Sequence, residues 1–164
     1  MLFAVGALLL LWQPSTFAQD RAAQQFISKA IQGNLAEVAL GKLAQEKGTS
    51  DGVKSFGQML VTDHSSANDK AMALAKTLGV QPPAEPSKAQ KATYEKFSKL
   101  SGAAFDREFI KHMVDDHKKD IREFQAAAKQ KDERVRAFAQ ETLPVLQKHL
   151  DTAQSLASAK QATR

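Results

Sequence analysis

A short pattern that occurs twice, fifty-three residues apart, limits the possible folds of this chain more than any other feature. The segment from Phe56 to His64 (FGQMLVTDH) has a counterpart from Phe109 to His117 (FIKHMVDDH). In both copies the first phenylalanine and the histidine are eight positions apart, so they share one face of an α-helix. Each copy therefore predicts a helix whose apolar face carries an imidazole into the protein interior.

Apolar residues recur at helical spacing along four long segments. The predicted helices run from about Asp20 to Gly48, Asp51 to Leu78, Ser101 to Gln130 and Asp132 to Ala159. Asp20 is expected to cap the first helix, while Gly79 and the following prolines close the second. Gly33 and Gly41, on the inward face of the first helix, are expected to let a neighbouring helix approach closely.

The connection from Gly79 to Leu100 is long and is expected to contain a short helix capped by Ser87, with Gln90 as its capping-box partner. Two tight helical hairpins joined in this way predict an all-α fold, a ferritin-like four-helix bundle with one long crossover between helices two and three. Because the connection is long enough to travel the length of the bundle, helices two and three can run in either relative direction.

The N-terminal segment is apolar and carries no charged residue before Pro14. It is too short for a transmembrane helix, which needs about 20 apolar residues, and Ala18 ends a small-residue stretch typical of signal-peptide cleavage. We expect residues 1–18 to be a signal peptide and residues 19–164 to form a single domain. The protein is then periplasmic or otherwise exported, and membrane-tethered if the segment is retained.

Composition excludes several kinds of site. The chain has 164 residues and no cysteine, so disulfides, thiolate metal sites and cysteine nucleophiles are absent. The net charge is +5, but the lysines and arginines are dispersed among aspartates and glutamates, and no nucleic-acid-binding motif occurs. We therefore expect no nucleic-acid partner. Weak association with anionic envelope lipids or polyanions remains open.

Four metal-capable residues lie on the inward faces of the four helices, namely Glu37, His64, His117 and His149. Counted from the helical turns, all four fall near the middle of their helices, so a rise of 1.5 Å per residue brings them to similar heights. An unsatisfied buried polar group costs about 1–3 kcal/mol. The layer must therefore be hydrogen-bonded internally, hydrated or occupied by a cation.

Three imidazoles and a carboxylate suit one divalent transition metal, Zn²⁺, Cu²⁺, Ni²⁺ or Fe²⁺. Asp63 and Asp116, each next to a histidine, are candidates to orient a neighbouring ring by accepting a hydrogen bond. A purely hydrogen-bonded polar layer is the alternative. The repeated pattern fits either internal duplication or convergent packing around a common site.

Several stretches resemble the bacterial family called domain of unknown function 4142. They include the segments around Ala36-Glu37-Val38, Asp63-His64, Ser101 to Asp106, Met113 to His117, and Thr142 to Leu150, in the family's order. The resemblance covers about Asp20 to Leu156. It implies an exported, ferritin-like helical bundle, of a kind often labelled a membrane protein, and marks Glu37 and the three histidines. It implies no activity.

The chain departs from true ferritins in one respect that concerns chemistry. Their di-iron sites use Glu-x-x-His pairs, whereas Val61, Val114 and Leu146 stand three residues before the three histidines. The sequence therefore has no di-iron motif and suggests a single metal at most.

Three functions follow from these observations. The first is an exported bundle that binds one metal ion in metal handling or envelope stress. The second is a non-catalytic structural or interaction module of the cell envelope, because no nucleophile lies beside a base. The third is a metal-dependent enzyme with Glu37 as general base.

Overall fold

The computed structural model describes residues 16–162, and every regular element in that range is an α-helix. The helices are α1 (Thr16–Lys47), α2 (Asp51–Thr77), α3 (Lys88–Ser98), α4 (Gly102–Ala127) and α5 (Glu133–Ala162). The predicted all-α class is confirmed. The described chain has five helices, and α3 is the short helix expected within the long connection.

The helix ends follow from local capping chemistry. The Ser50 hydroxyl accepts a hydrogen bond from the Val53 amide at the start of α2. Ser87 and Gln90 form the predicted capping box at the start of α3, each side chain accepting from the other residue's backbone amide. Gly79, with a φ of 66°, follows the C-cap of α2, a conformation that glycine adopts without steric cost.

The start of α1 differs from the prediction. The helix begins at Thr16, so Asp20 lies inside it and is not its N-cap. No proline or glycine occurs between Thr16 and Gly33, so nothing in this stretch interrupts helical hydrogen bonding. Of the predicted signal peptide, residues 1–15 lie outside the described range and the last three belong to α1. Its cleavage stays a prediction. None of the helices within residues 16–162 combines the length and apolar character needed to cross a membrane.

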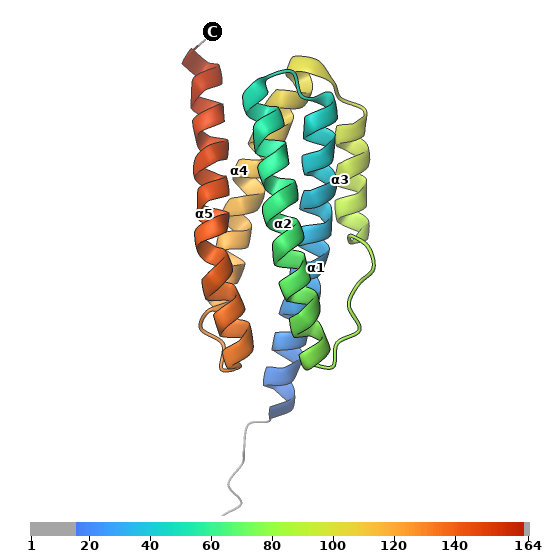
Figure 1. Ribbon diagram of the computed structural model, residues 1–164, viewed down its shortest axis with the longest axis vertical. Helices are drawn as coiled ribbons and strands as arrows, with labels where there is room; N and C mark the ends of the chain where they lie inside the picture. Colours follow the sequence, from blue (N-terminus) through green and yellow to red (C-terminus); the bar gives the residue numbers. More distant parts are fainter. Residues whose placement is uncertain (1–15, 163–164) are drawn as a thin grey trace, which may run out of the picture.

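The four long helices lie side by side along the long axis of the molecule, and α3 covers one flank (Figure 1). The strongest packing pairs are α1 with α2 and α4 with α5; α2–α5 and α1–α4 contacts join them. The chain leaves the bottom of α2 in Figure 1, and α3 carries it back to the top. Helices α2 and α4 therefore run in the same direction, which the sequence left open.

Glycines bring α1 and α2 into close contact at one level. A Cβ on Gly41 would lie 2.7 Å from the Gly57 carbonyl oxygen, and a Cβ on Gly57 would lie 2.6 Å from that of Gly41. Only glycine fits at both positions without displacing backbone. The expectation for Gly41 is thus confirmed. The expectation for Gly33 is wrong, because a Cβ there would meet no atom within 4 Å.

Two apolar clusters fill the interior, one toward each end of the bundle. The first includes Ile27, Ile31, Phe124, Phe138 and Leu146. The second includes Leu40, Phe56, Leu60, Phe105, Phe109 and Met113. Each long helix contributes residues to both clusters, and the polar residue predicted for that helix lies between the two sets. The polar layer is therefore buried between two apolar regions.

A buried carboxylate ties α4 to the turn between α1 and α2. Asp106, 2% exposed, accepts hydrogen bonds from the Thr49 amide at 3.0 Å, the Thr49 hydroxyl at 2.8 Å and the Ser50 amide at 3.1 Å. Three donors offset the desolvation of the charge. This contact sets the height of α4 relative to α2, and so that of their two histidines.

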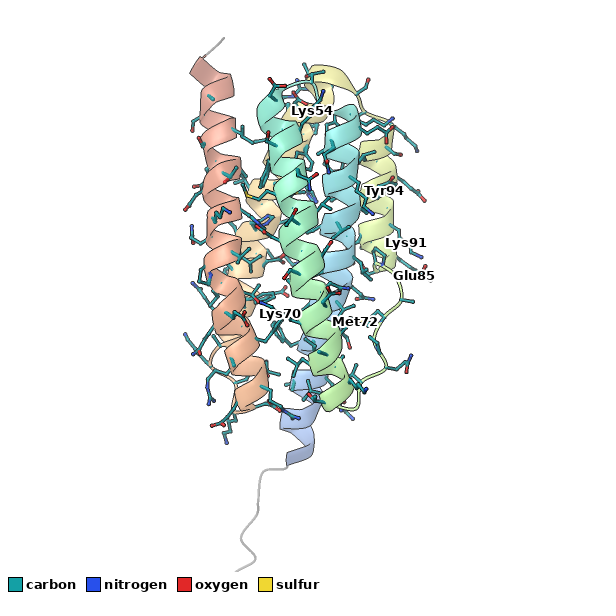
Figure 2. The ribbon with its side chains drawn as sticks, in the orientation of Figure 1. Lys54, Lys70, Met72, Glu85, Lys91 and Tyr94 are labelled. Carbon is teal, nitrogen blue, oxygen red and sulfur yellow. The ribbon has the colours of Figure 1, made fainter. Side chains whose placement is uncertain are left out.

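Charged side chains are dispersed over the surface (Figure 2). Lys70 on α2 pairs with Glu141 on α5, and Lys91 pairs with Glu85 at 2.6 Å. Both pairs are exposed to water, so each contributes about 0–1 kcal/mol at most. The surface has the mixed charge that the sequence predicted.

Candidate metal centre

Three histidines from three helices converge in the polar layer. His64 on α2, His117 on α4 and His149 on α5 each offer one ring nitrogen, and these nitrogens all lie within 4.8 Å of one another. The residues are 5%, 0% and 0% exposed. The ring centroids are 5.2 Å apart for two pairs and 5.9 Å for the third. The sequence thus predicted residues that the fold brings together.

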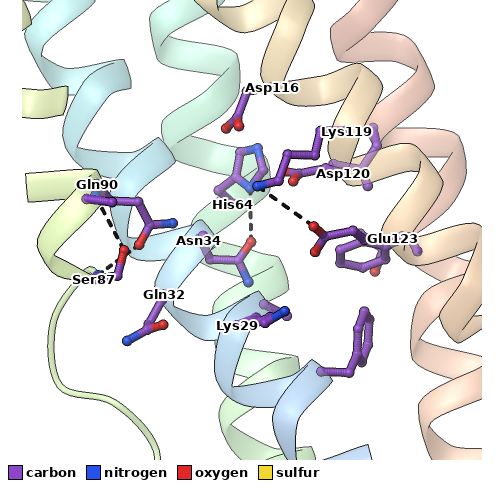
Figure 3. Close-up of a pocket in the computed structure, with 17 residues that line it drawn as sticks. Lys29, Gln32, Asn34, His64, Ser87, Gln90, Asp116, Lys119, Asp120 and Glu123 are labelled. Carbon is purple, nitrogen blue, oxygen red and sulfur yellow. Dashed lines mark hydrogen bonds and ion pairs between the residues drawn. The ribbon is translucent and has the colours of Figure 1, made fainter. Parts of the chain in front are cut away.

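One nitrogen of each ring has an acceptor outside the cluster. His64 Nδ1 lies 3.0 Å from Asn34 Oδ1 (Figure 3), and His117 Nδ1 lies 3.0 Å from the carbonyl oxygen of Met113. His149 Nε2 lies 2.9 Å from Asp63 Oδ2. Each outer nitrogen donates to its acceptor, which fixes the tautomer and leaves the inner nitrogen with a lone pair. The same second-sphere arrangement orients histidines that bind metals.

The inner nitrogens lack enough hydrogens to satisfy one another. His117 Nε2 lies 3.2 Å from His149 Nδ1, and His64 Nε2 is buried with no hydrogen-bond partner among the described residues. Asp63, His149, His117 and the Met113 carbonyl form a chain joined by three contacts at hydrogen-bond distance, and each contact needs one hydrogen. The two neutral imidazoles supply only two. A third hydrogen requires a buried imidazolium.

Burial opposes that imidazolium. Burial and, as the second cause, the neighbouring His149 ring lower the pKa of His117 to about 4, although the hydrogen bond to the Met113 carbonyl opposes this. Burial, then the two other rings, holds the pKa of His64 well below its ordinary value. Burial also lowers the pKa of His149, although the hydrogen bond and the charge of Asp63 oppose this. The rings are therefore neutral near pH 7, and a cation bound by the inner lone pairs would resolve the missing hydrogen.

Glu37 lies in the same buried layer, yet it is not one of the three residues whose ligand atoms group within 4.8 Å. It is 2% exposed, and its Oε2 has no hydrogen-bond partner among the described residues. Burial raises the pKa of Glu37 well above its ordinary value, and the charges of Asp116 and Asp120 raise it further. Burial and the neighbouring carboxyl groups therefore favour the protonated form of Glu37 in the ion-free protein.

The two aspartates selected from the sequence take different places. Asp63 contacts His149 rather than the adjacent His64. Burial and then the charge of Asp116 raise the pKa of Glu37, and the same two causes bring the pKa of Asp120 to about 7. One aspartate thus orients a ring, and the other belongs to a group of carboxyls on one side of the layer.

Asn34 and the Met113 carbonyl complete the surroundings of the rings, and the sequence reasoning missed both. Asn34 is 6% exposed and lies one turn before Glu37 on α1. A polar residue three positions from Glu37 shares its face of the helix, so this signal was available. The Met113 carbonyl carries no sequence signal, because every residue has one.

Comparisons with known proteins give a family and a solved structure of similar fold. The model of a family described as domain of unknown function 4142 matches residues 13–156. A crystal structure of a DUF305 fragment from Deinococcus radiodurans superposes with a TM-score of 0.68 at 15% sequence identity, covering 90% of this chain and 99% of that one. No curated protein matches the sequence. At this identity the structural likeness supports the helical fold alone.

Proposed function

The chain belongs to the family described as domain of unknown function 4142, and because that description assigns no activity, we propose a function from the site itself. The protein binds one divalent transition-metal ion between His64, His117 and His149. The observation that carries this proposal is the shared arrangement of the three rings, in which each outer nitrogen donates to an acceptor and each inner nitrogen presents a lone pair with no hydrogen donor to satisfy it.

The donor set and its spacing support a metal. Nitrogens bound to a tetrahedral Zn²⁺ at about 2.1 Å lie roughly 3.4 Å from one another. His117 Nε2 and His149 Nδ1 are already 3.2 Å apart, so the ion needs only a small movement of these rings. Three imidazoles suit Zn²⁺, Cu²⁺, Ni²⁺ or Fe²⁺. We propose that the four long helices form a ferritin-like bundle and that the ion lies in its interior.

We propose Glu37 as the fourth ligand of the metal ion. It would have to lose its proton and move toward the ion, which the positive charge of the metal favours. We therefore expect Glu37→Gln to weaken metal binding less than loss of a histidine does.

The decisive experiment is elemental analysis by mass spectrometry of protein purified without a histidine tag or chelator from an exporting host. We expect close to one equivalent of a single metal in the wild type, and none in His117→Ala. His112→Ala is the matched control, because His112 lies on α4 like His117 but outside the three-histidine cluster. Its ring packs against Phe97, with ring centroids 5.3 Å apart. Wild-type protein that lacks metal and ignores added Zn²⁺, Cu²⁺ and Fe²⁺ would contradict the proposal.

The hydrogen bonds of the layer favour one other function, a non-catalytic envelope module in which the polar layer is structural. In that case His64→Asn with His117→Asn should fold almost as stably as wild type and bind no metal. Substitution of the same positions by apolar residues of similar volume should then raise stability, because the buried polar groups would only be a cost.

We also propose that the protein is exported and that residues 1–18 are removed. The apolar, uncharged N-terminal stretch supports this. N-terminal sequencing of the protein recovered from the periplasm tests it, and an intact Met1 would contradict cleavage.

A further inference from the structure

A cavity of about 400 Å³ lies between α1 and α4 and reaches the metal-binding layer (Figure 3). Of the three clustered histidines, His64 is the one that lines it. The first turn of α3, with Ser87 and Gln90, lies at its edge. Its volume falls within the range of about 300–1,000 Å³ that is typical of small-molecule sites.

Gly33 keeps one wall of this cavity open. It lies in the middle of α1, where glycine destabilises a helix by roughly 0.5–1 kcal/mol relative to alanine. Gly41 is explained by its close contact with Gly57, but a Cβ on Gly33 would meet no atom within 4 Å. Neither a turn nor helix packing requires glycine at this position. The open space in front of it is what a larger side chain would fill.

Two buried polar atoms at the cavity lack partners among the described residues. They are Nδ2 of Asn34 and Nε2 of His64, in residues that are 6% and 5% exposed and that both line the cavity. The amide nitrogen donates a hydrogen bond and so calls for an acceptor. The imidazole nitrogen offers a lone pair, which the proposed metal would take. An oxygen donor bound to that metal would answer both requirements.

The remaining walls combine apolar side chains, the uncharged polar residues Gln32, Ser87, Gln90 and Thr142, and charges that nearly balance. Phe26 and Phe124 meet edge to face with centroids 5.0 Å apart, and Ala30 and Leu146 lie beside them. The charged lining residues are Lys29, Lys119, Asp116, Asp120 and Glu123. Lys119 is 3.8 Å from Glu123, so that pair is internally neutralised. An uncharged molecule with an apolar body fits these walls better than an ion.

We propose that the cavity binds a small uncharged organic molecule with an apolar body and an oxygen-donor head, which accepts a hydrogen bond from Asn34 and coordinates the metal held at His64. This inference rests on the proposed metal binding and adds the class of ligand. The apolar body packs against Phe26 and Phe124.

Two probes with the same head group test the proposal. Benzohydroxamic acid and acetohydroxamic acid are both uncharged in neutral solution. Each coordinates a metal through the same two oxygens and releases its hydroxyl proton to water as it does so, but only the first carries a phenyl ring. Each is titrated into Co²⁺-loaded protein while the visible spectrum of the ion is followed. We expect the wild type to bind the phenyl compound at least about tenfold more tightly, because the ring leaves water for the apolar wall.

Gly33→Phe should block the cavity without touching the metal ligands. A cavity of about 150 Å³ already accepts benzene, so a phenyl side chain fits into this larger one. The variant should keep its Co²⁺ and lose the preference for the phenyl probe. Gly33→Ala, which adds one methyl group, is the control and should retain the preference. Gly33→Leu serves the same purpose if the phenylalanine variant does not fold.

The outcomes separate the two proposals. If the wild type binds none of Co²⁺, Zn²⁺, Cu²⁺ and Fe²⁺, the metal function and this inference both fail. If Co²⁺ binds but the two probes bind equally, or merely strip the ion, the ligand site is wrong and the metal function stands. A phenyl preference that survives in the variant with the blocked cavity would also overturn the inference.

Discussion

Asp63 accepts a hydrogen bond from Nε2 of His149 at 2.9 Å, although the two residues are 86 positions apart in the chain. This contact turns the other nitrogen of the ring, Nδ1, toward His117 at 3.2 Å. A carboxylate on α2 thus decides which nitrogen of a ring on α5 faces the site. Such contacts tune both ring orientation and basicity in metal-binding histidines.

Asp63→Asn should weaken metal binding without abolishing it. The amide oxygen can still accept the hydrogen bond, but it lacks the negative charge that makes the ring a better donor. We expect the metal affinity to fall by about 10–100-fold. Competition with a coloured chelator measures this, and Asp69→Asn, an exposed change on the same helix, is the control. Equal affinities in wild type and Asp63→Asn would show that the carboxylate does not act on the metal.

Metal should stabilise the fold in proportion to its binding. A free metal concentration of 100 times Kd adds about 2.7 kcal/mol to the free energy of unfolding. For a domain of this size, that raises Tm by roughly 5–10 °C. Thermal unfolding with and without metal measures the shift, and EDTA should reverse it. His117→Ala should show no shift; a shift of the same size in that variant would place the ion elsewhere.

Metal affinity should persist to unusually acidic pH. An ordinary imidazole ligand begins to lose metal to protons below its pKa of about 6.5. Burial lowers the pKa of His117 to about 4, so protons compete with the metal at this ring only as the pH approaches that value. Titrations with Zn²⁺ between pH 7 and pH 4 measure the apparent affinity. A steep loss beginning already near pH 6.5 would contradict the buried, neutral state of the rings.

Asp120→Asn should stabilise the ion-free protein at alkaline pH. Burial, then the charge of Asp116, raises the pKa of Asp120 to about 7 from its ordinary 3.8. Between these two pKa values the folded state holds a proton that the unfolded state has released. The free energy of unfolding therefore falls as the pH rises from about 4 to about 7. At pH 8 the variant should be more stable by an amount on the order of 2 kcal/mol, because one pKa unit corresponds to about 1.4 kcal/mol.

Urea unfolding of Asp120→Asn at pH 8 and at pH 4 tests the sign of this effect. The stabilisation should shrink as the pH approaches 4, where the wild-type carboxyl is protonated in the folded protein. A variant that is less stable than wild type at pH 8 would show that the negative charge of Asp120 is needed in the fold.

Two glycine-to-alanine changes on facing helices should have opposite effects. Gly57→Ala places a Cβ 2.6 Å from the Gly41 carbonyl oxygen, so the helices must separate, at a typical cost of about 1–3 kcal/mol. Gly33→Ala meets nothing within 4 Å and should stabilise the helix by roughly 0.5–1 kcal/mol. Chemical denaturation of the two variants measures both. Loss of stability in Gly33→Ala would show that the wall of the cavity is more crowded than its geometry indicates.

The helices could be predicted from the sequence because the signals that form and end them are local. Periodic apolar residues, the Ser87–Gln90 capping box and Gly79 act within a few positions of the chain, so the sequence displays them directly. Where a signal was weak, the prediction failed. Asp20 is a good capping residue, but nothing in the preceding residues ends the helix, and α1 extends past it to Thr16.

Helical periodicity and the positions of the turns were enough to predict that His64, His117, His149 and Glu37 lie on inward helix faces, and all four side chains are buried. Three features could be read only from the folded protein: Asp63 contacts His149, Asn34 contacts His64, and Glu37 is not a member of the three-histidine group. These contacts depend on how far each helix is rotated and shifted against its neighbours. Rotation and shift come from side-chain packing across the whole bundle, which no local pattern encodes.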